Sequence, residues 1–193
     1  MASTKTGAVH DAFWQGGTHH WATPKDLSGL QSPILTATER LITDAGVARI
    51  SSGLLPTGTL LMSSRAPIGY LAIAAVPVAI NQGFIAMPPG GELSPVWLLY
   101  WAKTNMEAIK QKANGSTFME ISKAAFRPIK VVVPPPKIRA QFDEVAAPMM
   151  ERIKNCGYHI AALAALRDTL LPRLISGQLR VPGAEAFMKV RNS

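Results

Sequence analysis

The last third of the chain carries an apolar pattern that is typical of one long helix. Apolar side chains recur there on two ladders with a seven-residue step, offset by four and three residues. This spacing places them on one narrow stripe of a helix. A stripe of this length needs another helix to cover it, in the same chain or in a second copy. The predicted helix interface consists of Phe142, Met149, Ile153, Cys156, Ile160, Leu163, Leu170 and Leu174.

Prolines set the expected limits of this helical region. Because a proline inside a helix removes a backbone hydrogen bond, Pro148 predicts two pieces, over 137–147 and 148–171, and Pro172 predicts a kink or an end. The longer piece would span roughly 35 Å at about 1.5 Å per residue. Three consecutive prolines at 134–136 precede the region. We therefore expect a domain over 1–135, a helical region over 136–180 and a tail over 181–193.

The first two thirds of the chain have the sequence pattern of a small α/β (α+β) domain. Short apolar runs between glycines and prolines predict buried strands over 59–64, 70–74, 78–80 and 84–87. Ser94 followed by Pro95 predicts a helix start, and the helix should continue to about Gly115. The remaining expectations are an irregular loop over 1–22, short helices over 38–45 and 119–125, and a strand over 129–133. The predicted fold is thus a small mixed-sheet domain followed by a long coiled-coil-type helical arm.

Positive charge is concentrated in one segment. The chain has a net charge of +8, and residues 103–139 hold eight basic residues against two acidic ones. A localised basic field favours a polyanion as partner, nucleic acid first, although a solvated basic surface without a partner explains the charge equally well. The single Cys156 fits a reducing cytoplasm. The most apolar run, over 70–80, is too short to cross a bilayer, so we expect a cytoplasmic protein with no membrane contact.

Three polar clusters follow apolar strands or helices and are candidates for reading DNA. Arginine pairs with guanine, asparagine and glutamine pair with adenine, and hydroxyls and lysines contact phosphates. Each cluster alone is ordinary turn chemistry. Together with the basic segment they favour a DNA-reading face. The candidate DNA-binding residues are Lys25, Ser63, Ser64, Arg65, Asn81, Gln82, Lys110, Lys112, Asn114, Ser116, Thr117 and Lys123.

Catalytic motifs give little support for an enzyme. The sequence contains no Walker-type phosphate loop, no serine nucleophile elbow and no paired cysteines. His19 and His20, with His10 and Asp11 nearby, are candidate metal ligands, but their spacing is not that of a helical ligand pair. A small metal-dependent nuclease using His19, His20 and Asp26 is the enzymatic alternative.

An ordered series of short motifs resembles a known family. The motifs are THHWATPKDL at 18–27, ERLITDAG at 39–46, LPTGTLLMSSRAPIG at 55–69, AINQGF at 79–84 and LRDTLLPRLISG at 166–177. In this order they resemble the specificity (S) subunit of type I restriction-modification systems. The resemblance implies a non-catalytic chain in which a target recognition domain reads half of a split site in double-stranded DNA. It also implies that the helices set the gap between half-sites and dock methyltransferase (M) subunits, which the restriction (R) subunit joins.

The resemblance also sets expectations for cofactors and assembly. No cofactor is expected in this chain, since S-adenosylmethionine and ATP would be carried by the partner subunits. A full S subunit has two recognition domains and two helical regions, whereas this chain resembles a half subunit with one of each. Two copies paired through the helix would read an inverted repeat. The chain also begins late relative to the family pattern, so the alternative is a truncated remnant that binds partners by its helix and no longer reads DNA.

Overall fold

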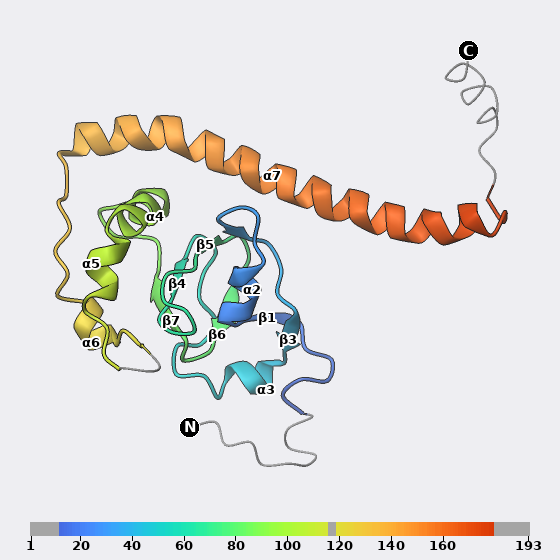
Figure 1. Ribbon diagram of the computed structural model, residues 1–193, viewed down its shortest axis with the longest axis horizontal. Coiled ribbons are helices and arrows are strands. Elements are labelled where there is room, and N and C mark those ends of the chain that lie inside the picture. Colours follow the sequence, from blue (N-terminus) through green and yellow to red (C-terminus); the bar gives the residue numbers. More distant parts are fainter. Residues whose placement is uncertain (1–11, 116–118, 180–193) are drawn as a thin grey trace. The chain divides into compact units, whose positions relative to one another are not determined.

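The computed structural model describes residues 12–115 and 119–179 (Figure 1). Its contacts divide the chain into two units, one that ends at Lys154 and one that begins at Asn155. The first unit contains all the strands and helices up to the middle of the last helix. The second contains the remainder of that helix. Each unit is described by itself below.

Two small sheets form the centre of the first unit. One has the order β3-β1-β6, with β1 antiparallel to β3 and parallel to β6, and the other has the order β2-β5-β4-β7. In the second sheet β4 is antiparallel to both β5 and β7, and the short β2 is parallel to β5. The strands are β1 (His19–Ala22), β2 (Ile34–Leu35), β3 (Arg40–Ile42), β4 (Leu60–Ser63), β5 (Leu71–Ala74), β6 (Val78–Ile80) and β7 (Phe84–Met87).

The four apolar runs are confirmed as β4, β5, β6 and β7, which lie within the predicted ranges. The loop predicted over 1–22 is wrong where β1 forms, and the helix predicted over 38–45 is wrong where β3 forms. Neither strand has an apolar run, and both form through pairing with distant segments. β1 pairs with β3, in the register His20 to Leu41, and also with β6. Gly17 permits this pairing, since a Cβ there would lie 2.7 Å from the backbone nitrogen of Ile42.

Among the described residues, five short helices accompany the sheets, and three of them, α4, α5 and α6, lie together on one side of the strands (Figure 1). The predicted start at Ser94 is confirmed, since its hydroxyl accepts a hydrogen bond from the Trp97 backbone at 3.2 Å. The predicted single helix to about Gly115 is wrong. Asn105 interrupts it, because its side-chain amide donates to the carbonyl of Trp101 at 2.8 Å and ends α4. The helices are α2 (Pro24–Ser28), α3 (Asp44–Val47), α4 (Pro95–Thr104), α5 (Met106–Lys110) and α6 (Lys123–Phe126).

Two further predictions in the basic segment need correction. The helix predicted over 119–125 begins only at Lys123, where Ser122 caps it, and the preceding residues are extended. Residues 129–133 form no strand, and Val132 in their middle is exposed. Prolines at 128 and 134 flank this run, and a proline has no backbone N–H to donate to a neighbouring strand.

Three clusters of buried apolar side chains hold the first unit together. The first fills the space around Leu35, Leu61 and Phe84. The third joins Met62 of β4 to Ile109 of α5 and to Ile121. Thus β4 contributes to opposite sides of its sheet with alternate residues, as the pleat requires. The strand end that follows Met62 is consequently fixed from both sides.

The last helix, α7 (Pro136–Ile175), is continuous, so the predicted break at Pro148 is wrong. A proline inside a helix costs about 3 kcal/mol. Packing on both sides of Pro148 offsets this cost, because Phe142 and Ala146 before it and Met150 after it contact the cluster that includes Leu99 of α4. Pro172 lies in the last turn, and the helix ends three residues beyond it.

The front half of α7, residues 136–154, packs Phe142 and Ile153 of the predicted stripe inward, with Met150 in place of Met149. Its inward positions are Phe142, Ala146, Met150 and Ile153, an eleven-residue step over three turns. Met150 is 7% exposed, whereas the predicted Met149 is 61% exposed. Met149 therefore lies off the face that packs within the chain, because a seven-residue step drifts off the face of a straight helix. Its assignment to a helix interface stays a prediction.

The rear half of α7, residues 155–175, carries exposed apolar side chains. Ile160 and Leu163 are 68% and 65% exposed, and Cys156, Leu170 and Leu174 are exposed as well. Their assignment to a helix interface stays a prediction. Across the described part of the chain, no helix has the length and apolarity needed to span a bilayer.

Candidate nucleic-acid interface

Three loops that sequence analysis selected separately are joined at Ser64. Its backbone N–H donates to the carbonyl of Gly83 at 2.8 Å, and its carbonyl accepts from the backbone of Ile121 at 3.0 Å. Asn114 and Glu120 then exchange two backbone hydrogen bonds, of 3.0 and 2.9 Å. The end of β4, the turn between β6 and β7 and the loop after α5 therefore form one continuous surface.

The two serines of the first cluster build this surface and do not present their hydroxyls on it. Ser63 is fully buried, and its hydroxyl donates to the carbonyl of Pro67 at 2.7 Å and accepts from the backbone of Tyr70 at 2.8 Å. Ser64 is also buried. Neither of these two predicted residues exposes its hydroxyl in this structure, because both are covered by the loops that they position.

A cavity of about 490 Å³ brings three of the predicted residues together, and we call it the Arg65 cavity. Lys25, Arg65 and Asn81 line it, with Ser28 and Tyr70 among the other lining residues. None of the described residues that line it is an aspartate or a glutamate. The wall thus combines two cations with an amide, a set of donors suited to phosphates and to purine edges.

Each cation of the Arg65 cavity has a carboxylate partner outside the lining. Lys25 Nζ lies 2.7 Å from Glu39, and this hydrogen bond and the charge of Glu39 raise the pKa of Lys25 above its ordinary value. The Arg65 guanidinium lies 3.7 Å from Glu120, and both side chains are about half exposed. Exposed pairs of this kind contribute about 0–1 kcal/mol, so a phosphate competes with them readily.

The turn over 81–83 holds its amide side chains in different ways. The side-chain oxygen of Asn81 accepts from the Gly83 backbone at 2.9 Å, which fixes the carboxamide. Gln82 between them is exposed. Gly83 packs closely against α2, since a Cβ there would lie 3.0 Å from Pro24. The turn is therefore tight, with Gln82 as its outward side chain.

The predicted phosphate-contacting lysines flank the loop after α5. Lys110 ends α5 and lies 3.5 Å from Glu107. Lys112 follows it and is exposed, and Lys123 is exposed at the start of α6. Ser116 and Thr117, predicted for the same loop, lie outside the described residues. The structure therefore places cations on both arms of the loop that contains Asn114.

The candidate metal ligands do not gather. His19 Nε2 lies 2.7 Å from Asp44, whereas His20 Nδ1 lies 3.2 Å from the Thr38 hydroxyl, on the opposite face of β1. Asp26 accepts from the backbone and hydroxyl of Thr23. Within residues 12–115 and 119–179 no three potential ligands form a group. His10 and Asp11 lie outside that range.

Sequence reasoning missed Ser28 and Tyr70, which line the Arg65 cavity. Tyr70 precedes β5, and an aromatic residue at a strand start is usually a core residue. A signal was nevertheless present, since a glycine stands directly before it, with a φ of +106° at Gly69. That conformation marks a loop that turns sharply before the strand.

Comparison with known proteins identifies the family. The family model for the type I restriction modification DNA specificity domain matches residues 3–156. The chain is 36% identical over 145 residues to the type I restriction enzyme MjaIX specificity subunit of Methanocaldococcus jannaschii, covering 74% of this chain and 33% of that protein. It is 24% identical over 148 residues to the HindI specificity subunit of Haemophilus influenzae, covering 75% and 32%. The chain thus spans about a third of the length of these curated relatives.

Solved structures agree on the fold. The HsdS subunit from Thermoanaerobacter tengcongensis matches with a TM-score of 0.51 and 18% identity, over 86% of this chain and 39% of that one. A chain from a study of complex assembly and conformational transition in the type I R-M system matches with a TM-score of 0.52 and 18% identity, over 90% and 42%. The predicted combination of mixed sheets and a long helix is confirmed. The chain belongs to the family of type I restriction modification DNA specificity domains.

Proposed function

We propose that this chain reads a short sequence in double-stranded DNA as the specificity component of a type I restriction-modification complex. The observation that carries the proposal is the junction of three loops at Ser64, which puts Arg65 and Asn81 on one cavity wall. Family membership supports it independently. In this proposal Arg65, Gln82 and Asn114 face base edges, where guanidinium and carboxamide groups discriminate purines.

Phosphate contacts complete the proposed interface. Lys25, Lys110, Lys112 and Lys123 stand around the loops and supply cations that position the duplex without reading it. Ser116 and Thr117 stay in the proposal as further phosphate contacts. Ser63 and Ser64 take a different role, because their buried hydroxyls and backbone groups shape the loops.

In this proposal the chain catalyses no reaction. Methyl transfer and DNA cleavage belong to the M and R subunits, which carry S-adenosylmethionine and ATP. This chain selects the sequence on which they act. The exposed apolar stripe on the rear half of α7 supplies the surface for assembly.

We further propose that this stripe pairs with the same helix of a second copy. Ile160, Leu163 and Leu170 are exposed at steps of three and seven residues, which is the spacing of a helix-pairing seam. A pair related by a two-fold axis presents two identical reading surfaces in opposite orientations. The preferred DNA would then be an inverted repeat with a fixed gap.

The test is selection from random duplexes by the purified chain at near-physiological salt. Enrichment of an inverted repeat with a constant gap supports both DNA reading and the two-fold pair. Enrichment of a single short site supports reading and contradicts the pair. No enrichment, combined with capture of the methyltransferase subunit, contradicts DNA reading and supports an assembly scaffold.

A further inference from the structure

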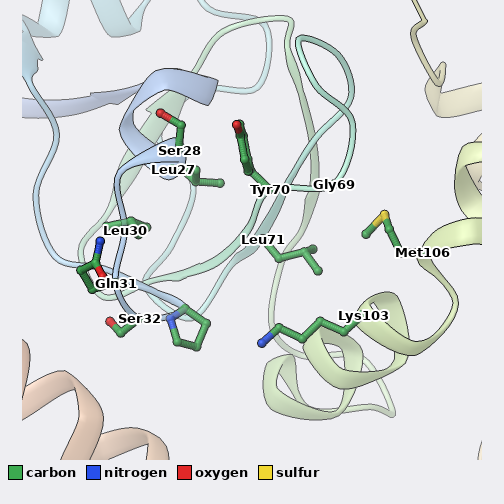
Figure 2. Close-up of a pocket in the computed structure, with 11 residues that line it drawn as sticks. Leu27, Ser28, Leu30, Gln31, Ser32, Gly69, Tyr70, Leu71, Lys103 and Met106 are labelled. Carbon is green, nitrogen blue, oxygen red and sulfur yellow. The ribbon is translucent and has the colours of Figure 1, made fainter.

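A second cavity lies next to the Arg65 cavity and shares part of its wall. Its volume is about 450 Å³, and Figure 2 shows the side chains around it. Ser28 and Tyr70 line both cavities, so the two meet at these side chains. The opposite wall comes from Lys103 at the end of α4 and from Met106 of α5. We call this second space the Lys103 cavity.

The lining of the Lys103 cavity is suited to an anion. Ser28, Gln31, Ser32 and Tyr70 contribute hydroxyl and amide groups, and Lys103 contributes a positive charge. No aspartate or glutamate is among its described lining residues. In Figure 2 the Lys103 side chain extends from α4 toward Ser32, across one side of the cavity.

Lys103 differs from the two cations of the Arg65 cavity. Lys25 and Arg65 have carboxylate partners, whereas no described carboxylate lies within ion-pair distance of Lys103. Its Nζ lies 5.8 Å from the ring centroid of Tyr100, a weak contact for an exposed amine. An anion that enters this cavity therefore meets a cation without displacing an internal carboxylate.

The position of this cavity fits the path of a nucleic-acid backbone. Gly69 brings the start of β5 against α5, since a Cβ there would lie 2.7 Å from the Met106 sulfur. This approach sets Tyr70 between the two cavities. Arg65 thus lines the cavity on one side of Tyr70, and Lys103 lines the cavity on the other.

We propose that the Lys103 cavity binds the phosphodiester backbone of DNA beside the bases that the loops read. Lys103 contacts one phosphate, and Ser32 and Gln31 are donors to its oxygens. This inference rests on the proposed DNA-reading function. It extends that function to Lys103 and the cavity around it, which are not among the residues proposed above to contact DNA. Its ligand is a phosphodiester within a duplex, since the contact to one phosphate alone would be weak.

The test is Lys103→Gln in the full chain, with Lys130→Gln as the matched control. Lys130 is an exposed lysine that lines neither cavity and has no proposed contact. Binding of a random-sequence duplex is measured by fluorescence anisotropy over a range of KCl concentrations. Loss of one phosphate contact reduces the slope of log affinity against log salt by about 0.9. We expect this reduction for Lys103→Gln, wild-type slope for Lys130→Gln, and a retained slope for Lys103→Arg.

A second measurement locates the contact on the DNA. Neutral methylphosphonate linkages are placed singly along the selected duplex. At one linkage beside the read bases, the wild-type protein should lose affinity and the Lys103→Gln protein should lose none. Equal losses for both proteins at every linkage would overturn the inference.

The outcomes separate this inference from the function on which it rests. If the wild type binds duplex DNA and Lys103→Gln keeps the full salt slope, the Lys103 cavity is not part of the interface. If Lys103→Gln keeps that slope but captures less methyltransferase subunit, the cavity instead contacts an acidic protein surface. If no protein binds duplex DNA, the proposed function fails and this inference fails with it.

Discussion

The two halves of α7 use similar apolar residues in opposite ways. In the front half, Phe142 packs edge-on against Trp97 at a ring-centroid distance of 4.8 Å, and the nearby Ser94 hydroxyl donates to Asp143 at 2.5 Å. In the rear half, Ile160 and Leu163 are mostly exposed. The front half therefore belongs to the core of the first unit. The rear half displays apolar surface that the described chain leaves uncovered.

The difference teaches that periodicity identifies a buried face without identifying what buries it. The front half finds its partner in α4, which the sequence places about forty residues earlier. The rear half has the same helical character and no such neighbour among residues 155–179, the described part of its own unit. One helix thereby combines a segment packed into the core with a segment whose apolar side chains are exposed.

The largest expected effect is on stability, and it distinguishes two adjacent methionines in the front half. Met150→Ala should lower the free energy of unfolding by about 2–5 kcal/mol, because it removes a buried side chain from the α4 contact. Met149→Ala is the matched control and should change stability by less than about 0.5 kcal/mol. Urea unfolding followed by circular dichroism measures both. Equal losses would break the distinction between the inward and outward faces.

The next effect concerns the rear half. Leu163→Ala should weaken self-association by about 10- to 100-fold, since a fully buried leucine contributes about 1.5–3 kcal/mol. Sedimentation velocity over a concentration series measures this change. A wild-type chain that is monomeric at high concentration would remove the homodimer and leave the stripe for a different partner.

A comparable effect is expected at the reading loops, independent of either half of α7. Arg65→Gln should reduce discrimination at one base position by about 1–3 kcal/mol. The gap between half-sites should not change, because in the proposed function the helix pair sets that gap. Repeating the selection with this variant measures both quantities. A shifted gap, or a base preference retained at every position, would contradict the proposal that the loops read the bases and the helix sets the spacing.

The smallest effect is expected at the carboxylate beside Arg65. Glu120→Gln removes an exposed partner worth about 0–1 kcal/mol, so affinity for random duplexes should rise by up to about fivefold. Glu151→Gln is the control, because Glu151 pairs with Lys154 on α7, outside the reading loops. Anisotropy titrations at one salt concentration are sufficient. A fall in affinity for Glu120→Gln would mean that this carboxylate orients Arg65 for binding.

Local sequence signals predicted part of this fold well. The strands β4 to β7 and the cap at Ser94 follow from apolar runs and capping chemistry. The strands β1 and β3 did not, because their pairing is a long-range contact with no local apolar signature. Continuity through Pro148 also depends on tertiary packing, which a local rule about proline does not include.

The candidate site was predicted as residue types and not as a surface. Arg65, Asn81 and Lys25 were selected by chemistry, and the structure places them on one cavity. Ser63 was selected by the same chemistry and is buried, because a hydroxyl that caps a loop cannot be told from an exposed hydroxyl in a sequence. Lys103 was counted only as part of a charged segment, since its place in the wall of a cavity that Tyr70 also lines depends on the fold.

The hydrogen bonds at Ser64 have a consequence for how such a domain changes its target. The loops are joined there through main-chain groups, which every residue type except proline supplies in full. Side chains on the outer surface of these loops can therefore be exchanged while the frame that carries them stays in place. A domain built in this way can acquire a new recognition sequence by a few substitutions and keep its fold.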